Sequence, residues 1–446
     1  MSALAPAQAA LPARPAMSAD GWVQTLSCVV LILTFVYVVF GIPGQDLTDT
    51  RQTDRVSPYN SLIWLVLLAL SVPVLIRQRR DVAALLLSCW PLLLLFAYFG
   101  LSASWALDPS ASFRRFMFTL VQLAIFTSVV VGIRRAPTIH TVIAATCAAS
   151  AVADLLYWLA APGAAMTSEG FGGLQQQKNQ AGLLMMLGCL SAATCLWLLR
   201  ERRGRRALAA PLVVMVVLLL ATRSSTSAAV TFAAAIVMPA LLAVSRLRGT
   251  AGWAILASLA FAVTFGLVIY LAYSGLTGRD PWLPLRGVTF TARTDIWRFV
   301  MHQIAQRPLV GAGYSSFWSI NPAVQPSLKS GAWFGTDSII NEAHNGYLDL
   351  LATTGIIGLI GGLFVLFRTI ALAALAMVRA EPAEAAWRSG DLARPTAVFY
   401  LALTLGLVVH NFTESNLFSN NGVLAVALLI AVLDLEKWRL RRRRAA

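Results

Sequence analysis

Long apolar runs follow one another through most of this 446-residue chain. Hydrophobic residues make up 58% of the sequence and charged residues only 12%, and the mean hydropathy is +0.71. A run of about 17 to 25 apolar residues can cross the hydrocarbon core of a bilayer as a helix. Because these runs leave no room for a large soluble domain, the sequence predicts an all-α integral membrane protein.

We predict about twelve transmembrane helices, which lie near residues 22–40, 59–76, 82–101, 116–133, 138–160, 180–199, 207–222, 224–244, 251–275, 346–367, 396–410 and 422–436. Nine of them fall within 21–275 and three within 346–436. The predicted remainder is a disordered cytoplasmic tail (1–20), a large polar loop with an amphipathic helix (276–345) and a basic cytoplasmic tail (437–446).

The net charge of +15 invites a nucleic-acid partner, but the position of the charge indicates membrane topology instead. More than half of the 35 Lys and Arg residues lie in every second predicted loop, from RQRR at 77–80 to KWRLRRRR at 437–444. Such loops are typically cytoplasmic, and their charge can also attract anionic membrane lipids. The sequence therefore predicts cytoplasmic termini and, in a bacterial inner membrane, a periplasmic 276–345 loop, where no ATP or nucleotide sugar is available.

Within this loop, the stretch from Thr291 to just before Pro308 has a helical pattern. One face carries Ile296, Phe299, Val300 and Ile304, whereas Arg298 and other polar residues fall on other faces. This pattern predicts a helix lying along the membrane surface. Arg293 is placed in its first turn, where a cation opposes the helix dipole, and a bound anion would remove that conflict.

Arg223 interrupts the apolar sequence VVLLLATRSSTSAAV between two predicted spans. An arginine at membrane depth costs about 2.5 to 3.5 kcal/mol on the insertion scale. Two interpretations remain open. The side chain either extends to the outer headgroups and caps the preceding span, or it binds an anionic headgroup just below the outer surface.

His344 is one of four histidines and lies where the loop meets the span that begins near residue 346. It either satisfies its hydrogen bonds at the interface or, as a neutral imidazole, accepts a proton from a hydroxyl group. His302 and His410 are also on the predicted outer side but have no adjacent motif. Glu342 and Asn345 flank His344 and could orient the imidazole or a substrate, or cap the following helix.

No nucleotide-binding or metal-binding motif accompanies these residues. The sequence contains no GxxxxGK[ST] or HExxH, no Cys/His cluster and no paired aspartates on the predicted outer face. We therefore expect neither a metal nor another cofactor. Arginines would have to supply the positive charge that a metal supplies elsewhere.

The motif at His344 resembles the signature of the O-antigen ligases, a group related to O-antigen polymerases and pilin oligosaccharide transferases. His344 and Asn345 are followed by nine residues, GYLDLLATT, and then by GIIG from Gly355 to Gly358. Three weaker similarities occur in the same order as in that family: SASWALDPS at 102–110, QQQKNQAG at 175–182, and the arginines in ATRSS and ARTDIW.

This resemblance implies a membrane glycosyltransferase. It would move a glycan from undecaprenyl diphosphate to a sugar hydroxyl of lipid A-core by a metal-independent, inverting displacement. His344 would be the general base, and Arg223 and Arg293 would stabilise the diphosphate. Lys178, Arg298, Glu342 and Asn345 would bind substrate.

Two alternatives stay open. An O-antigen polymerase would use the same motif to join lipid-linked repeat units. A transporter of an anionic lipid or sugar could also gather arginines and a histidine, but such folds usually have paired halves with interrupted helices near the midplane. The sequence shows no such repeat, and its candidate residues gather at one predicted surface.

Overall fold

Helices form nearly all of the regular structure in this computed structural model, which describes residues 21–40, 58–134, 136–199, 201–247, 293–336, 339–418 and 422–445. The first half of the chain forms α1 (Gly21–Phe40), α2 (Pro58–Arg77), α3 (Arg79–Ser88), α4 (Trp90–Ser102), α5 (Pro109–Gly132), α6 (Ala136–Ala160), α7 (Pro162–Ala165), α8 (Lys178–Leu198), α9 (Arg202–Ala221) and α10 (Ser225–Val244). A small hairpin of β1 (Met166–Thr167) and β2 (Gly170–Phe171) follows α7.

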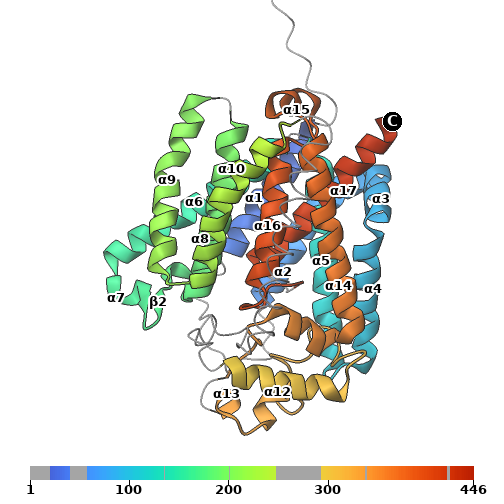
Figure 1. Ribbon diagram of the computed structural model, residues 1–446. Helices are drawn as coiled ribbons and strands as arrows, with labels where there is room; N and C mark the ends of the chain where they lie inside the picture. The colour runs from blue at the N-terminus through green and yellow to red at the C-terminus, as the bar shows by residue number, and fades with distance from the viewer. Residues whose placement is uncertain are drawn as a thin grey trace, which may run out of the picture.

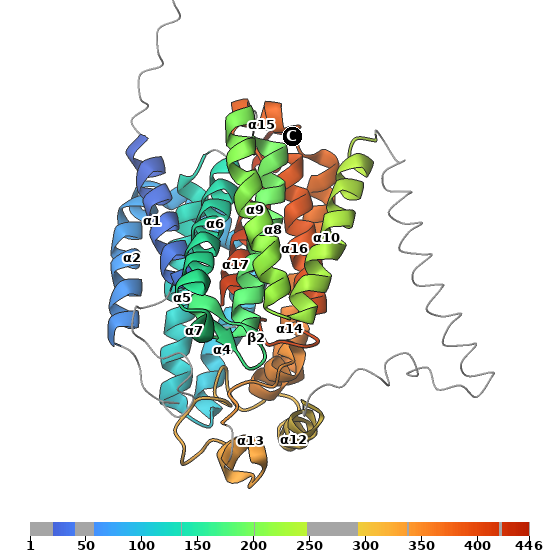
Figure 2. The ribbon, with the colours of Figure 1, turned by 90° about the vertical axis from the view of Figure 1, so that its left-hand side faces the viewer.

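The second half forms α12 (Arg293–Gln306), α13 (Trp333–Thr336), α14 (Gly346–Arg379), α15 (Ala383–Ser389), α16 (Arg394–His410) and α17 (Val423–Ala445). The long helices pack side by side as one bundle, with α16 near its centre (Figure 1). In both views α12 and α13 lie at one end of the bundle, and α15 and the end of α17 lie at the other (Figures 1 and 2).

The all-α membrane prediction is confirmed, but the count of twelve spans is not. Eight described helices are long and apolar enough to cross a membrane, and a ninth crossing would need the pair α3 and α4, which is bent by 81°. Pro91 follows the break at Cys89, and a proline early in a helix fits the start of a new segment. Helix α16 is shorter than a typical span, and α17 is too charged to qualify. The predicted span at 251–275 lies outside the described residues.

The basic C-terminal segment is also not a separate tail, because α17 continues to Ala445. Arg441 donates to the Gly390 carbonyl at 2.7 Å, and Arg444 pairs with Asp81 at 3.2 Å. These contacts hold the basic end of α17 against α3 and the segment after α15.

The helix predicted from Thr291 is α12, and its apolar face is the predicted one, since Ile296, Val300 and Ile304 are buried. That face, however, is not free to rest on a membrane surface. The face packs in a small core with Phe317 and Ala352, so the protein itself covers it.

A sharp kink in α14 joins this loop region to the bundle. Gly355 has φ 66° and ψ −171°, a conformation that only glycine adopts readily. The kink frees the backbone N–H of Ile356, which donates to the Pro308 carbonyl at 2.9 Å. A Cβ atom at position 355 would lie 2.2 Å from the Leu309 carbonyl oxygen. The first glycine of the GIIG sequence is therefore required for close contact with the loop.

The segment at 102–110 fixes the same loop from the other side. The N–H of Leu107 donates to the Ala312 carbonyl at 2.9 Å, and the N–H of Asp108 donates to Ser316 Oγ at 2.8 Å. Asp108 also caps the start of α5 by accepting from the Ala111 N–H. This segment thus serves to dock the loop that carries α12 and α13.

Candidate functional site

Four charged or titratable side chains meet at the end of the bundle that carries α12. His344 Nδ1 lies 2.9 Å from Glu342 Oε1 and 3.5 Å from Glu414 Oε2. Glu414 Oε1 lies 3.0 Å from Nη2 of Arg293, the first residue of α12. The structure therefore brings together three of the predicted site residues and adds Glu414, which follows α16.

Neighbouring helices hold Glu414 in place. Asn179, at the start of α8, donates to Glu414 Oε1 at 2.9 Å. Arg293 Nη1 donates to the Thr413 carbonyl at 2.6 Å, and Thr413 Oγ1 lies 2.9 Å from Thr226 Oγ1 at the start of α10. The cluster thus lies where the first turns of α8, α10 and α12 meet the segment after α16.

The backbone at His344 is strained and firmly held. Its φ of 49° is in the left-handed region, which costs a residue other than glycine of order 1–3 kcal/mol and is typical of functional sites. On one side, the Ala343 N–H donates to both carboxylate oxygens of Asp349, at 3.1 and 3.0 Å. On the other, the Asn345 N–H donates to Ser415 Oγ at 3.1 Å. These bonds offset the strain and fix where the imidazole points.

The two glutamates change the protonation of His344. Burial alone would lower its pKa, but the contacts with Glu342 and Glu414 and their negative charges outweigh burial and raise the pKa to about 9. His344 Nδ1 has no hydrogen bond of normal geometry among the described residues, so these short contacts are ion pairs. At neutral pH the imidazole is mostly protonated.

Glu414 remains ionised in spite of its burial. Burial raises its pKa, but the contact with His344 and the positive charges of His344 and Arg293 lower it below the usual glutamate value. The anion that the sequence leads us to expect at Arg293 is, in this structure, the side chain of Glu414.

Arg223 lies in the turn between α9 and α10, on the same end of the bundle. It is exposed, and its φ of 55° is again in the left-handed region. The turn lies close to the cluster because Ser227 Oγ approaches His410 Nε2 at 3.4 Å, and Thr226 contacts Thr413. No contact between Arg223 and the cluster occurs in the part of the chain that the structure describes.

The other predicted substrate-binding residues differ in position. Asn345 caps α14, since its Oδ1 accepts from the Tyr347 and Leu348 N–H groups, both at 3.1 Å. Lys178 pairs with Glu169 at 2.6 Å, beside Asn179 rather than in the cluster. Arg298 pairs with Asp295 at 3.2 Å on the exposed side of α12, and no described contact joins it to His344.

Glu414 and Asn179 were not among the residues predicted from the sequence. Each had a signal. Glu414 is the acid in HNFTESNLFSNN, a polar segment on the predicted outer side, and Asn179 follows Lys178 in QQQKNQAG. Without a fold, nothing indicated that these segments meet at His344.

The same cluster bears on the expected absence of a metal. Three possible metal ligands lie within 4.8 Å of one another: a carboxylate oxygen of Glu342, a ring nitrogen of His344 and a carboxylate oxygen of Glu414. These three side chains could therefore hold a cation. Their negative charge, however, is already matched by Arg293 and by the protonated imidazole. A cation would have to displace both, so we keep the prediction that transfer needs no metal.

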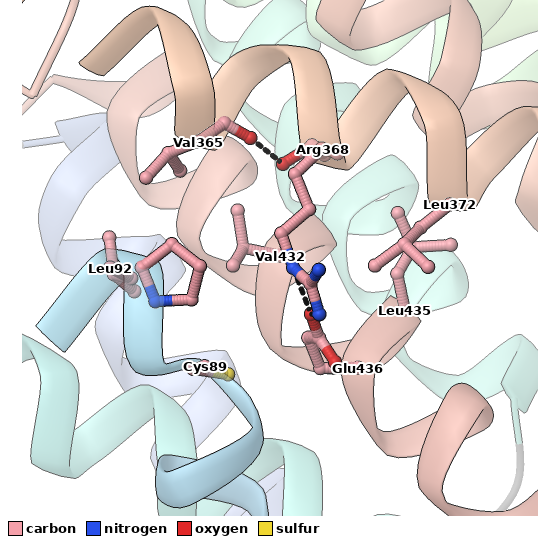
Figure 3. Close-up of a pocket in the computed structure, with 10 residues that line it drawn as sticks. Cys89, Leu92, Val365, Arg368, Leu372, Val432, Leu435 and Glu436 are labelled. Carbon is pink, nitrogen blue, oxygen red and sulfur yellow. Dashed lines mark hydrogen bonds and ion pairs between the residues drawn. The ribbon is translucent and has the colours of Figure 1, made fainter. Parts of the chain in front are cut away.

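A second charged cluster lies toward the opposite end. In a narrow crevice, Arg368 of α14 extends between apolar side chains to Glu436 of α17, with Nη2 and Oε1 2.5 Å apart (Figure 3). Arg439 and Ser88 bind the other Glu436 oxygen at 2.7 and 2.6 Å.

A cavity of about 520 Å³ lies at the same end of the bundle as the Glu436 cluster, between α3, α15 and the end of α17. In the Glu436 cluster the buried carboxylate is paired with Arg368 and Arg439, so we assign this cluster a structural role: it holds α14 and α17 together.

One comparison with known proteins matches a part of the chain that includes α12. Residues 210–363 match the O-antigen ligase family, and the match spans Arg223, Arg293, Glu342 and His344. A comparison with curated proteins finds no match. The membrane helices and the cluster around His344 are consistent with this similarity to the O-antigen ligase family over residues 210–363.

Proposed function

We propose that this protein is an O-antigen ligase that transfers a glycan from undecaprenyl diphosphate to a sugar hydroxyl of lipid A-core, on the periplasmic face of the inner membrane. The family covers both ligases and polymerases, and both reactions use lipid-linked glycans. The observation that carries the proposal is the meeting of Arg293, Glu342 and His344 at one end of a membrane bundle.

The position of the cluster suits a lipid-linked donor. Its polyprenyl chain would lie among the apolar helices, and its diphosphate would lie at the helix ends beside Arg293 and Arg223. Guanidinium groups can bind phosphate oxygens with two parallel hydrogen bonds. As the bond between the anomeric carbon and the diphosphate breaks, negative charge grows on the leaving oxygen, and both arginines would stabilise it.

His344 supplies the second half of the reaction. The acceptor hydroxyl attacks the anomeric carbon opposite the leaving group, and its proton passes to the neutral imidazole. The undecaprenyl diphosphate leaves with the bonding electron pair. A single displacement of this kind inverts the configuration at that carbon. Glu342 and Glu414 then stabilise the imidazolium that forms.

A reconstitution with two acceptors tests this function. Purified protein in lipid receives a glycan-linked undecaprenyl diphosphate together with either lipid A-core or a second lipid-linked repeat unit. We expect glycan on lipid A-core, with inverted anomeric configuration, and the same rate in excess chelator. Transfer only to the second repeat unit would identify a polymerase. Activity that disappears with chelator and returns with Mg²⁺ or Mn²⁺ would show that the site uses a metal.

The pKa of His344 predicts how transfer depends on pH. A general base must be neutral, so kcat/KM should rise with pH and level off only above about 9. Glu342→Gln removes one negative charge beside the imidazole, which lowers its pKa, so this variant should level off at lower pH. A profile that is flat from pH 6 to 9 in both proteins would contradict the role of His344 as base.

The same shift affects stability. The pKa of His344 is raised above that of an unfolded histidine, about 6.5. Its ion pairs with Glu342 and Glu414 therefore stabilise the fold fully below that pH, and the contribution is lost as the pH rises through about 9.

The proposed topology can be tested by cysteine labelling. Ala323 lies in the loop beyond α12, and Ala385 lies on α15 at the opposite end of the bundle; both residues are exposed. Each is replaced by cysteine in a separate variant, Ala323→Cys or Ala385→Cys. In intact inner-membrane spheroplasts, an impermeant maleimide should label position 323 and leave 385 unlabelled until the membrane is broken. The unsubstituted protein gives the background from its five free cysteines, none of which is exposed. The reverse labelling would place the His344 cluster in the cytoplasm.

A further inference from the structure

The Arg293 guanidinium already binds two acceptors in this structure. Its Nη1 donates to the Thr413 carbonyl at 2.6 Å, and its Nη2 contacts Glu414 Oε1 at 3.0 Å. Both terminal nitrogens of the guanidinium are thus used by two consecutive residues. A phosphate that binds Arg293 through these same two N–H groups must first displace this segment.

The surroundings of the Glu414 carboxylate are those of an anion site. Three groups that favour a negative charge converge on it: the Arg293 guanidinium, the Asn179 amide at 2.9 Å and the His344 imidazole at 3.5 Å. Only 9% of the glutamate side chain is exposed. The carboxylate is therefore held where the Arg293 guanidinium and the Asn179 amide would stabilise a phosphate oxygen of the donor.

We propose that Glu414 is an internal competitor for the donor: its carboxylate occupies the phosphate position on Arg293, and donor binding displaces it. This rests on the proposed role of Arg293 in binding the diphosphate. The exchange replaces one anion with another on the same guanidinium, so it needs only a local movement of residues 413–414. After displacement, Glu414 keeps its contact with His344, the group that must take up the proton.

Arg223 would help the donor diphosphate to displace Glu414 from Arg293. It is exposed and contacts no acidic side chain among the described residues, so it can bind one phosphate before the exchange. The second phosphate is then held close to Arg293, and its displacement of Glu414 becomes an intramolecular step. Glu414 thus lowers donor affinity in the ground state and is released as the diphosphate settles between the two arginines.

Binding of undecaprenyl diphosphate without a glycan tests this proposal independently of transfer. The full-length protein in nanodiscs is titrated with this lipid. Four single variants (Glu414→Gln, Glu414→Asp, Glu342→Gln and Arg293→Lys) and the double variant Arg293→Lys/Glu414→Gln are compared with it. We expect Glu414→Gln to bind about 3- to 10-fold more tightly, because a charge-assisted contact of this kind no longer competes. Glu414→Asp keeps the charge but shortens the side chain, so it should also bind more tightly.

Two controls separate competition from a general charge effect. Glu342→Gln removes the same charge from the same cluster but contacts His344 rather than Arg293, so its gain should be much smaller. In an Arg293→Lys background, Glu414→Gln should give little further gain, because the contact is already lost. Thermal melting of each variant shows that it is folded.

The outcomes are distinguishable. If neither Glu414 variant binds more tightly than the unsubstituted protein, or if Glu342→Gln gains as much as Glu414→Gln, the competition is refuted. If Arg293→Lys alone leaves diphosphate binding unchanged, the proposed role of Arg293 fails instead, whatever the Glu414 variants do.

Discussion

His344→Ala should lose transfer activity by a factor of about 100 to 10,000, the usual contribution of a general base. The reason is that no other described side chain at this site can take the acceptor proton from the same place: Glu342 and Glu414 both face the imidazole. Binding of undecaprenyl diphosphate should persist, because His344 does not contact the arginines. Single-turnover transfer and donor binding, measured on the same preparation, check both statements.

A matched control is available on α12. His302 is exposed on that helix and belongs to no cluster among the described residues, so His302→Ala should keep normal transfer. A folded His344→Ala protein that transfers glycan at a near-normal rate would remove His344 from the mechanism. A loss of donor binding equal to the loss of transfer would mean that the residue acts in binding instead.

Gly355→Ala should destabilise the protein by about 3 kcal/mol or more and abolish transfer, although residue 355 contacts no proposed substrate. Alanine is strained at φ 66° and ψ −171°, and its Cβ would lie 2.2 Å from the Leu309 carbonyl oxygen. Relief of this clash would straighten α14 or push away the loop that carries α12 and Arg293. A lower melting temperature in detergent and loss of transfer are the measurements.

Gly361→Ala is the corresponding control, because Gly361 is in the regular part of the same helix. A Cβ atom there would meet only the end of the Leu95 side chain, at 3.0 Å, and that side chain can move. We expect this variant to be nearly as stable and active as the unsubstituted protein. Equal damage from both substitutions would show that the kink has no special role.

Much of the fold could be predicted because a bilayer restricts the choices so strongly. Apolar runs of sufficient length give helices at nearly every predicted position that the structure describes, from α1 to α14. Two of the predicted spans differ in the structure. The break at Cys89 and the charged half of α17 depend on contacts with neighbouring helices, such as Ser88 with Glu436. Hydropathy along the sequence contains no information about such partners.

The helix α12 shows the same limit. Its residues and its apolar face are as predicted, since helical periodicity is a local property. What covers that face could not be read from periodicity, because a membrane surface and a protein core are both apolar. In the structure, Phe317 and Ala352 cover it, so the helix is fixed to the bundle.

For the site, the sequence by itself determined which residue types matter: a histidine at a helix start and arginines at span ends are unusual enough in an apolar chain to be noticed. The tertiary structure alone decided how they act. It placed Glu414, 70 residues after His344, between that histidine and Arg293, which raises the pKa of the imidazole and occupies the guanidinium. Charge interactions depend on distance in space, and the sequence gives no distance between segments that only folding brings together.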